Sequence, residues 1–127
     1  MKHAESKLQQ ACIKWFDYQY PQYKLNLFAI PNGGRRGKIE AAIMNGEGVR
    51  SGVADLFLAV PNSDFHGLFI EMKSEKGRQN ENQKLFEKAI SGNYAYILVS
   101  SFDQFKATIE GYLKINPFQN QPFTKID

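Results

Sequence analysis

The chain has 127 residues, with 16 basic and 13 acidic side chains and a formal net charge of +3. This is the length of one ordinary domain, which can bury a core without disulfides or structural metals. A hydrophobic fraction of 43% excludes a disordered chain, and the longest apolar run, Tyr94 to Val99, is too short to span a bilayer. The single Cys12 cannot form an intrachain disulfide and is expected to be buried and inert. Because the first residues lack the apolar segment of a signal peptide, we expect a cytoplasmic protein with no membrane partner.

The first half of the chain predicts a helix, a strand and a second helix. Apolar residues recur at helical spacing from Ala4 to Gln19, and Pro21 ends this helix. The stretch from Leu25 to Ile30 is typical of a strand, and the turn residues 31–34 stop it. A short helix with one apolar face is expected from Lys38 to Asn45, and a glycine-rich loop follows it.

The second half predicts a hairpin, a crossover helix, another strand and a last helix. Strands over 56–60 and 68–74 flank a turn and are expected to pair in antiparallel fashion. A helix is expected after the polar stretch Glu75–Asn82, and Gly92 ends it. The apolar stretch Tyr94–Ser100 is typical of a strand inside a sheet with both faces covered. The helix between these strands favours a parallel crossover. The last helix is expected from Phe102 to Lys114.

These elements predict an α/β fold with a mixed β-sheet flanked by α-helices. We place one domain over residues 1–114 and a C-terminal tail over 115–127. The tail has no regular pattern, and its aromatic residues suggest that it docks on the body or contacts a second subunit.

Side-chain alternation in the hairpin separates an apolar face from a charged one. If the turn is symmetric about residue 63 or 64, the even-numbered strand residues share one face, which is wholly apolar and should be core. The odd-numbered face near the open end then carries Asp55, Glu71 and Lys73. Three charges brought together on a largely buried sheet indicate a functional site.

This arrangement is what a Mg²⁺-dependent phosphodiesterase needs. Asp55 and Glu71 would supply the hard oxygen ligands that Mg²⁺ prefers. Lys73 points the same way as Glu71, so its ammonium can hold the attacking water or stabilise charge on the phosphate. The side chain of Met72 points into the core, and its backbone carbonyl offers a further oxygen ligand.

At these residues the sequence resembles the PD-(D/E)xK nuclease superfamily, and more narrowly its VRR-NUC family, over about residues 4 to 100. The similar segments are Glu5, residues 31–34, residues 48–56, Ile70-Glu71-Met72-Lys73-Ser74, Gly77-Arg78 and Gln83. The family usually has proline where this chain has Ser51 and Ala54, which changes the stiffness of the loop but leaves the aspartate in place.

The resemblance implies a restriction-endonuclease-like core and a set of residue roles. Asp55 and Glu71 would be metal ligands and Lys73 the catalytic lysine. Glu5 would bind the metal directly or through water, and Gln83 would orient Lys73 or a metal-bound water. The implied cofactor is Mg²⁺, with Mn²⁺ able to substitute. The implied protein is a homodimer that cuts branched DNA such as four-way junctions.

Each of these residues also has a structural interpretation. Glu71 and Lys73 can form a solvated ion pair, and Asp55 can cap the start of a strand. Gln83 stands three residues after Asn80, the spacing of a helix capping box. Glu5 lies in the first turn of a helix, where the dipole favours any acid.

Basic residues flank the predicted site and are candidates for contacts with the DNA backbone. The candidate DNA contacts are Asn32, Arg35, Arg36, Lys76 and Arg78. Ordinary surface charge is the alternative for any one of these. For the protein as a whole, the alternatives are a structure-independent endonuclease or nickase, and a non-catalytic DNA-binding module of the same fold.

Overall fold

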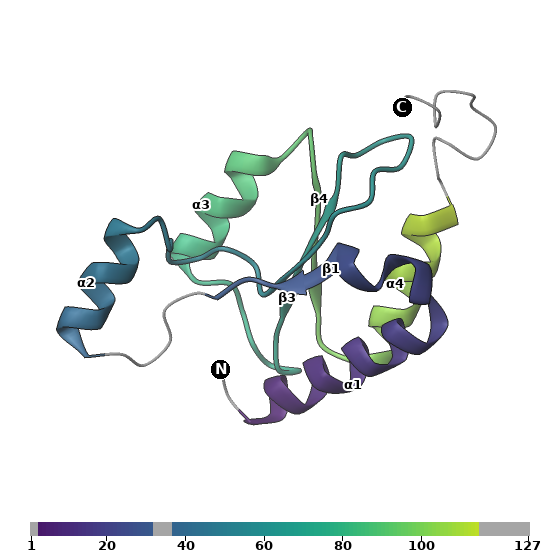
Figure 1. Ribbon diagram of the computed structural model, residues 1–127, viewed down its shortest axis with the longest axis horizontal. Helices are drawn as coiled ribbons and strands as arrows, with labels where there is room; N and C mark the ends of the chain where they lie inside the picture. Colours follow the sequence, from purple (N-terminus) through teal and green to yellow (C-terminus); the bar gives the residue numbers. More distant parts are fainter. Residues whose placement is uncertain (1–2, 32–36, 115–127) are drawn as a thin grey trace.

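The computed structural model describes residues 3–31 and 37–114 (Figure 1). The helices are α1 (His3–Gln19), the 3₁₀ helix η1 (Pro21–Asn26), α2 (Lys38–Gly46), α3 (Glu81–Ile90) and α4 (Phe102–Lys114). The strands are β1 (Leu27–Ala29), β2 (Leu56–Leu58), β3 (Leu68–Met72) and β4 (Ala95–Val99). Within the described part of the chain, no helix has the length and apolar character needed to cross a membrane.

The strands form one mixed sheet in the order β1-β2-β3-β4. β1 and β2 are antiparallel, β2 and β3 are antiparallel, and β3 and β4 are parallel. The pairs Leu56↔Ile70 and Leu58↔Leu68 centre the β2–β3 hairpin on Ser63. The predicted fold class, hairpin and parallel crossover are therefore confirmed, although β2 and β3 are each two residues shorter than expected.

The even-numbered face of the hairpin forms the core, as the alternation predicts. Helices α1 and α4 lie side by side and cover this face (Figure 1). Cys12 and Phe16 of α1 and Phe105 and Ile109 of α4 are fully buried against it. The core strand residues are Leu56, Leu58, Val60, Leu68, Ile70 and Met72. Burial also raises the pKa of the Cys12 thiol to about 11, so the thiol is unreactive at neutral pH.

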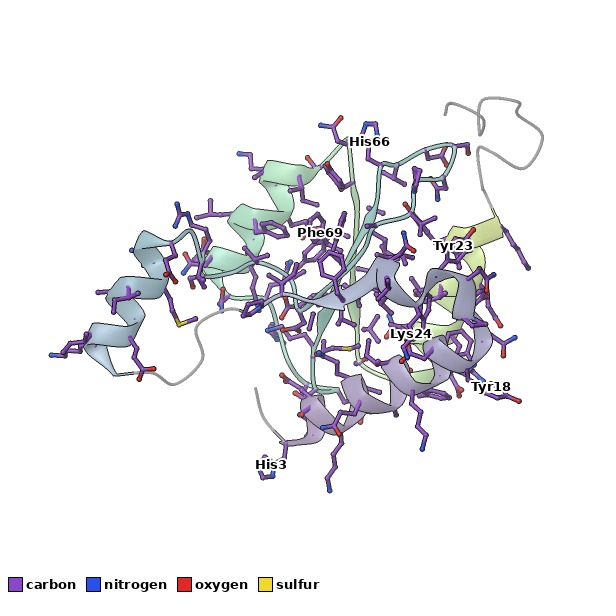
Figure 2. All side chains as sticks on the ribbon, viewed as in Figure 1. His3, Tyr18, Tyr23, Lys24, His66 and Phe69 are labelled. Carbon is purple, nitrogen blue, oxygen red and sulfur yellow. The ribbon has the colours of Figure 1, made fainter. Side chains whose placement is uncertain are left out.

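The odd-numbered face is covered by α3 through aromatic contacts. Phe69 of β3 lies in the middle of the molecule (Figure 2). Its ring is 4.4 Å from that of Phe57 and 5.0 Å from that of Phe86 on α3, measured between centroids. The edge-to-face geometry of Phe69 and Phe86 is a favourable aromatic arrangement and anchors α3 over β3.

The segment before β1 differs from the expected strand over 25–30. Pro21 starts a 3₁₀ helix, and Leu25 is 91% exposed in it. Proline suits the first turn of a helix because its missing N–H has no partner there and its φ is already helical. Only Leu27 to Ala29 pair as a strand, and Asn26 extends the ladder by donating from Nδ2 to the carbonyl of Ala59.

The sequence predicts that β4 lies inside the sheet. This prediction is wrong, because β4 is an edge strand of the described sheet. Helices cover both of its faces, so an apolar sequence requires no partner on its second edge. At that edge the Gln104 side chain accepts from the Ser100 N–H at 2.9 Å and donates to the Leu98 carbonyl at 3.0 Å. These are the two bonds that a residue of a parallel neighbouring strand would make. The amide thus closes part of an edge that would otherwise attract another strand.

Helix α2 projects from the body beside α3 (Figure 1). None of its residues is buried. Ile39 and Ile43, on the apolar face expected from the sequence, are 78% and 55% exposed.

Candidate active site

A glycine-containing loop brings Asp55 to the start of β2 by docking on the first turn of α3. Gly52 has a φ of +91°, and a Cβ there would overlap the backbone of Asn82. Beside this contact, Nδ2 of Asn82 donates to the hydroxyl of Ser51 at 3.0 Å. Only glycine combines this backbone conformation with such a close approach. The loop therefore reaches β2 along a path defined by α3.

Asp55 lies just before β2, is bonded to residues on β3 and just after β1, and is almost completely buried. Its Oδ2 accepts a hydrogen bond from the backbone N–H of Met72 at 2.7 Å, and its carbonyl accepts from the N–H of Ile30 at 2.9 Å. Continuing the register from Leu56↔Ile70 places Asp55 opposite Glu71. The Met72 peptide thus lies next to Asp55, while the Met72 side chain is buried in the core as expected.

Glu71 is 4% exposed, and its two carboxylate oxygens have different surroundings. Oε2 accepts a hydrogen bond from Nε2 of Gln83 at 2.9 Å. Oε1 is buried and has no hydrogen-bond donor among residues 3–31 and 37–114. A buried carboxylate oxygen without a donor is costly unless a proton or a cation compensates it.

Gln83 forms the capping box that its spacing from Asn80 allows, and its side chain also contacts the predicted site, where it binds Glu71 and not the expected Lys73. With Asn80 it forms a capping box, because its N–H donates to Oδ1 of Asn80 while its Oε1 accepts from the Asn80 N–H, each at 2.9 Å. The capping box uses only the oxygen of the side-chain amide. The nitrogen is left to bind Glu71, so the hydrogen bond of Gln83 goes to this carboxylate.

The electrostatics of the carboxylate pair favour binding of a positive charge. Burial, followed by the negative charge of Asp55, raises the pKa of Glu71 from 4.5 to about 8. Burial also raises the pKa of Asp55, against the lowering effect of the Met72 N–H. The charge of Lys73 lowers the pKa of both groups, so its ammonium lies close enough to stabilise their ionised forms.

Glu5 lies at the edge of this cluster. Its Oε2 accepts a hydrogen bond from the N–H of Ser74 at 3.1 Å, which joins the start of α1 to the end of β3. The negative charge of Glu5 contributes to raising the pKa of Asp55 and of Glu71. Over residues 3–31 and 37–114, no three His, Cys, Asp or Glu side chains meet as a ready metal cage. Glu5 is therefore close to the carboxylate pair without forming a three-carboxylate cluster with it.

The residues present fit a hard divalent cation. The pair offers carboxylate oxygens, one of which has no donor, and two carboxyls with raised pKa values. Mg²⁺ is bound in proteins through one or two carboxylates, and it keeps its other positions for water and phosphate oxygens. The two carboxylates are consistent with that pattern.

The loop after β3 carries two of the candidate DNA contacts. Lys76 and Arg78 are both exposed there. Asn32, Arg35 and Arg36 lie outside the described residues.

The sequence reasoning missed the network that holds this loop. Nε2 of Gln79 donates to Oε1 of Glu87 at 2.9 Å and to the hydroxyl of Tyr96 at 3.3 Å. Burial raises the pKa of Tyr96 to about 12, so its hydroxyl keeps its proton. No sequence pattern connects a loop glutamine to residues on α3 and β4, because these contacts depend on how the elements pack in the fold.

Comparisons with known proteins agree on the class of this domain. The family profile of the VRR-NUC domain matches residues 3–97. A solved structure described as "VRR_NUC domain protein" superimposes with a TM-score of 0.76 at 23% identity, covering 92% of this chain and 93% of that chain, and supports the same fold. No curated protein matches the sequence.

The chain is therefore an α/β domain whose function is of nuclease type. It belongs to the VRR-NUC family, as the resemblance of its motifs predicts.

Proposed function

We propose that the protein is a Mg²⁺-dependent endodeoxyribonuclease that hydrolyses phosphodiester bonds, with Mn²⁺ able to replace Mg²⁺. The observation that carries this proposal is the buried pair of Asp55 and Glu71, in which Oε1 of Glu71 has no hydrogen-bond donor within the described part of the chain. Folding has placed two carboxyls together at an energetic cost, and a binding site for a cation is the simplest use of such a pair.

Asp55 and Glu71 would hold the cation, which supplies positive charge to polarise a phosphate oxygen when it is bound. Gln83 holds one oxygen of Glu71 and leaves the other available. Lys73 lies directly after β3, two residues beyond Glu71 and on the same face, so its ammonium can orient the attacking water and stabilise charge developing on the phosphate. Glu5 closes the side of the site next to Ser74.

For the substrate we propose branched DNA such as four-way (Holliday) junctions, cut by a homodimer. Paired incisions require two active centres, and a dimer supplies them with a defined spacing. The exposed Lys76 and Arg78 would contact the DNA backbone beside the site. A structure-independent endonuclease or nickase uses the same residues, whereas a non-catalytic module has no use for a buried carboxylate pair.

The test is cleavage of labelled four-way junction, flap, linear duplex and single-stranded DNA in Mg²⁺, Mn²⁺ or EDTA. Wild type is compared with Glu71→Ala and Lys73→Ala. Matched controls are Glu40→Ala and Lys88→Ala, which remove exposed charges from α2 and α3.

We expect metal-dependent cutting of the junction, lost in both site variants and retained in both controls. Equal cutting of every substrate would refute the structural selectivity. Binding without any cutting would favour the non-catalytic module, and an active Glu71→Ala protein would exclude this site. Light scattering that shows a monomer at assay concentration would contradict paired incisions.

A further inference from the structure

An apolar groove lies away from the carboxylate pair, where the C-terminal half of α1 meets the start of α4. Its volume is about 470 Å³, and its lining residues are Ala11, Lys14, Trp15, Tyr18 and Phe102. Tyr18 is 86% exposed, and Figure 2 shows it at the C-terminal end of α1, with His3 at the opposite end. The structural roles described above leave this exposed aromatic surface unexplained.

The walls of the groove are held rigid by edge-to-face contacts. The Trp15 ring lies 6.3 Å from Phe102 and 6.0 Å from Phe105, measured between centroids, with interplanar angles of 83°. Tyr20 packs against the same indole at 5.8 Å. Trp15 and Phe102 therefore form a preorganised apolar surface, and Tyr18 can add a third ring beside it.

Two lysines lie in and beside the groove. Lys14 lines it, and Nζ of Lys106 lies 5.1 Å from the centroid of the Phe102 ring. Lys7 precedes Lys14 by two helical turns, so Lys7, Ala11, Lys14 and Tyr18 share one exposed face of α1. Asp17 and Asp103 are on the same two helices but do not line the groove. Aromatic rings with lysines along one track are typical of surfaces that bind single-stranded nucleic acid.

The distance between the groove and the carboxylate pair can be spanned by a short stretch of single-stranded DNA. Glu5, at the start of α1, is hydrogen-bonded to Ser74 beside the predicted catalytic lysine. Trp15 and Tyr18 follow it on the same helix, so at a rise of 1.5 Å per residue they lie about 15 to 20 Å further along the axis. This distance corresponds to about five stacked nucleotides.

We propose that this groove binds an unpaired nucleobase of a single-stranded DNA segment, while Lys7, Lys14 and Lys106 contact its phosphates. The base stacks on Trp15 and Tyr18, and the strand runs along α1. Binding of the base does not depend on the proposed cleavage. Only its placement, about five nucleotides from the scissile phosphate, rests on the proposed function.

The groove contains the only tryptophan of the chain, so binding can be followed by its fluorescence. The protein is titrated in EDTA, where the proposed metal-dependent cleavage cannot occur, with a short oligothymidylate. The comparison ligand is an abasic oligonucleotide of the same length, which keeps the phosphates and lacks the bases. The variants are Tyr18→Ala and, as a matched control, Leu85→Ala, which removes another exposed apolar side chain on α3.

We expect the oligothymidylate to quench the fluorescence and the abasic strand to leave it unchanged. Tyr18→Ala should weaken the binding of oligothymidylate by at least about tenfold, as the loss of one stacked base predicts. Leu85→Ala should bind like wild type. Equal quenching by the abasic strand, no quenching by oligothymidylate, or unchanged binding by Tyr18→Ala would overturn the proposal.

Sedimentation of the same samples without DNA tests the competing occupant. A wild-type dimer that Tyr18→Ala converts to a monomer would assign the groove to a second copy of the chain and overturn the proposal. The placement is tested with flap substrates made abasic at about five nucleotides from the cut site. Wild type should cut these flaps more slowly than normal flaps, whereas Tyr18→Ala should cut both at the same reduced rate. Quenching without cleavage of any substrate would refute the proposed function and leave the groove assignment standing.

Discussion

Replacing Glu71 with glutamine tests whether this carboxyl occupies its position at the expense of stability. The substitution keeps the shape of the side chain, and its carbonyl oxygen can still accept the hydrogen bond from Gln83. The new amide can donate to the Asp55 carboxylate, with which Glu71 interacts in the native protein. The variant therefore removes the charge and the titration of the group while retaining its contacts.

The sign and size of the effect follow from the raised pKa of Glu71, which lies at about 8 against 4.5 for the free group. Between these two values the folded protein keeps a proton that the unfolded chain has lost, so the free energy of unfolding falls as pH rises through this range. Such a rise in pKa corresponds to roughly 5 kcal/mol for a group wholly shielded from water. Because Glu5 and Lys73 beside the pair are half-exposed, so that water screens the charges there, we expect about 2 to 3 kcal/mol.

The measurement is urea unfolding followed by Trp15 fluorescence in EDTA between pH 5 and 9. At the alkaline end Glu71→Gln should be about 2 to 3 kcal/mol more stable than wild type, and near pH 5 the two should be equal. The control Glu47→Gln removes an exposed carboxylate and should follow the wild-type curve. When Mg²⁺ replaces EDTA in the same experiment, it should stabilise wild type and have little effect on Glu71→Gln. If the free energy of unfolding of Glu71→Gln does not exceed that of wild type at pH 9, the assignment of an uncompensated buried carboxylate is wrong.

Three further predictions concern the surroundings of the site and the edge of the sheet. Gly52→Ala, which would force a Cβ into the backbone of α3, should lower the free energy of unfolding by about 2 to 3 kcal/mol. Gly48→Ala has a similar positive φ but open space around it and should cost about 1 kcal/mol, so equal losses would argue against the docking of the loop. Gln104→Ala should increase self-association in light scattering by uncovering the β4 edge, and an unchanged particle size would mean that the amide does not protect it. Asn80→Ala and Gln83→Ala should each cost about 1 kcal/mol through the helix cap, but only Gln83→Ala should reduce cleavage, and equal cleavage by the two variants would contradict its role at Glu71.

The hairpin face could be read from the sequence because side chains on a strand alternate with a period of two. Once the turn was centred near Ser63, the opposition of Asp55 and Glu71 followed from counting alone. The same alternation correctly assigned the six apolar residues of the other face to the core.

The errors arose where local pattern does not decide the structure. Leu25 is apolar and compatible with a strand, but Pro21 starts a helical turn that leaves it exposed. The apolar sequence of β4 indicates that both of its faces are covered, and α3 and α4 cover them. It does not indicate how many strands lie beside β4. Likewise, the contact between Glu5 and Ser74 joins residues 69 positions apart and depends on how α1 packs across the sheet.

The first turn of α3 organises both carboxylates of the site from one place. Asn82 receives the glycine loop that carries Asp55, while Gln83 binds one oxygen of Glu71. The hairpin register places the two acids opposite each other, but it does not determine which oxygen is left without a donor. That selection comes from the helix, because the capping box with Asn80 uses the oxygen of the Gln83 amide and leaves only its nitrogen to face the carboxylate. A local signal for the start of a helix therefore also positions the group on which the proposed chemistry depends.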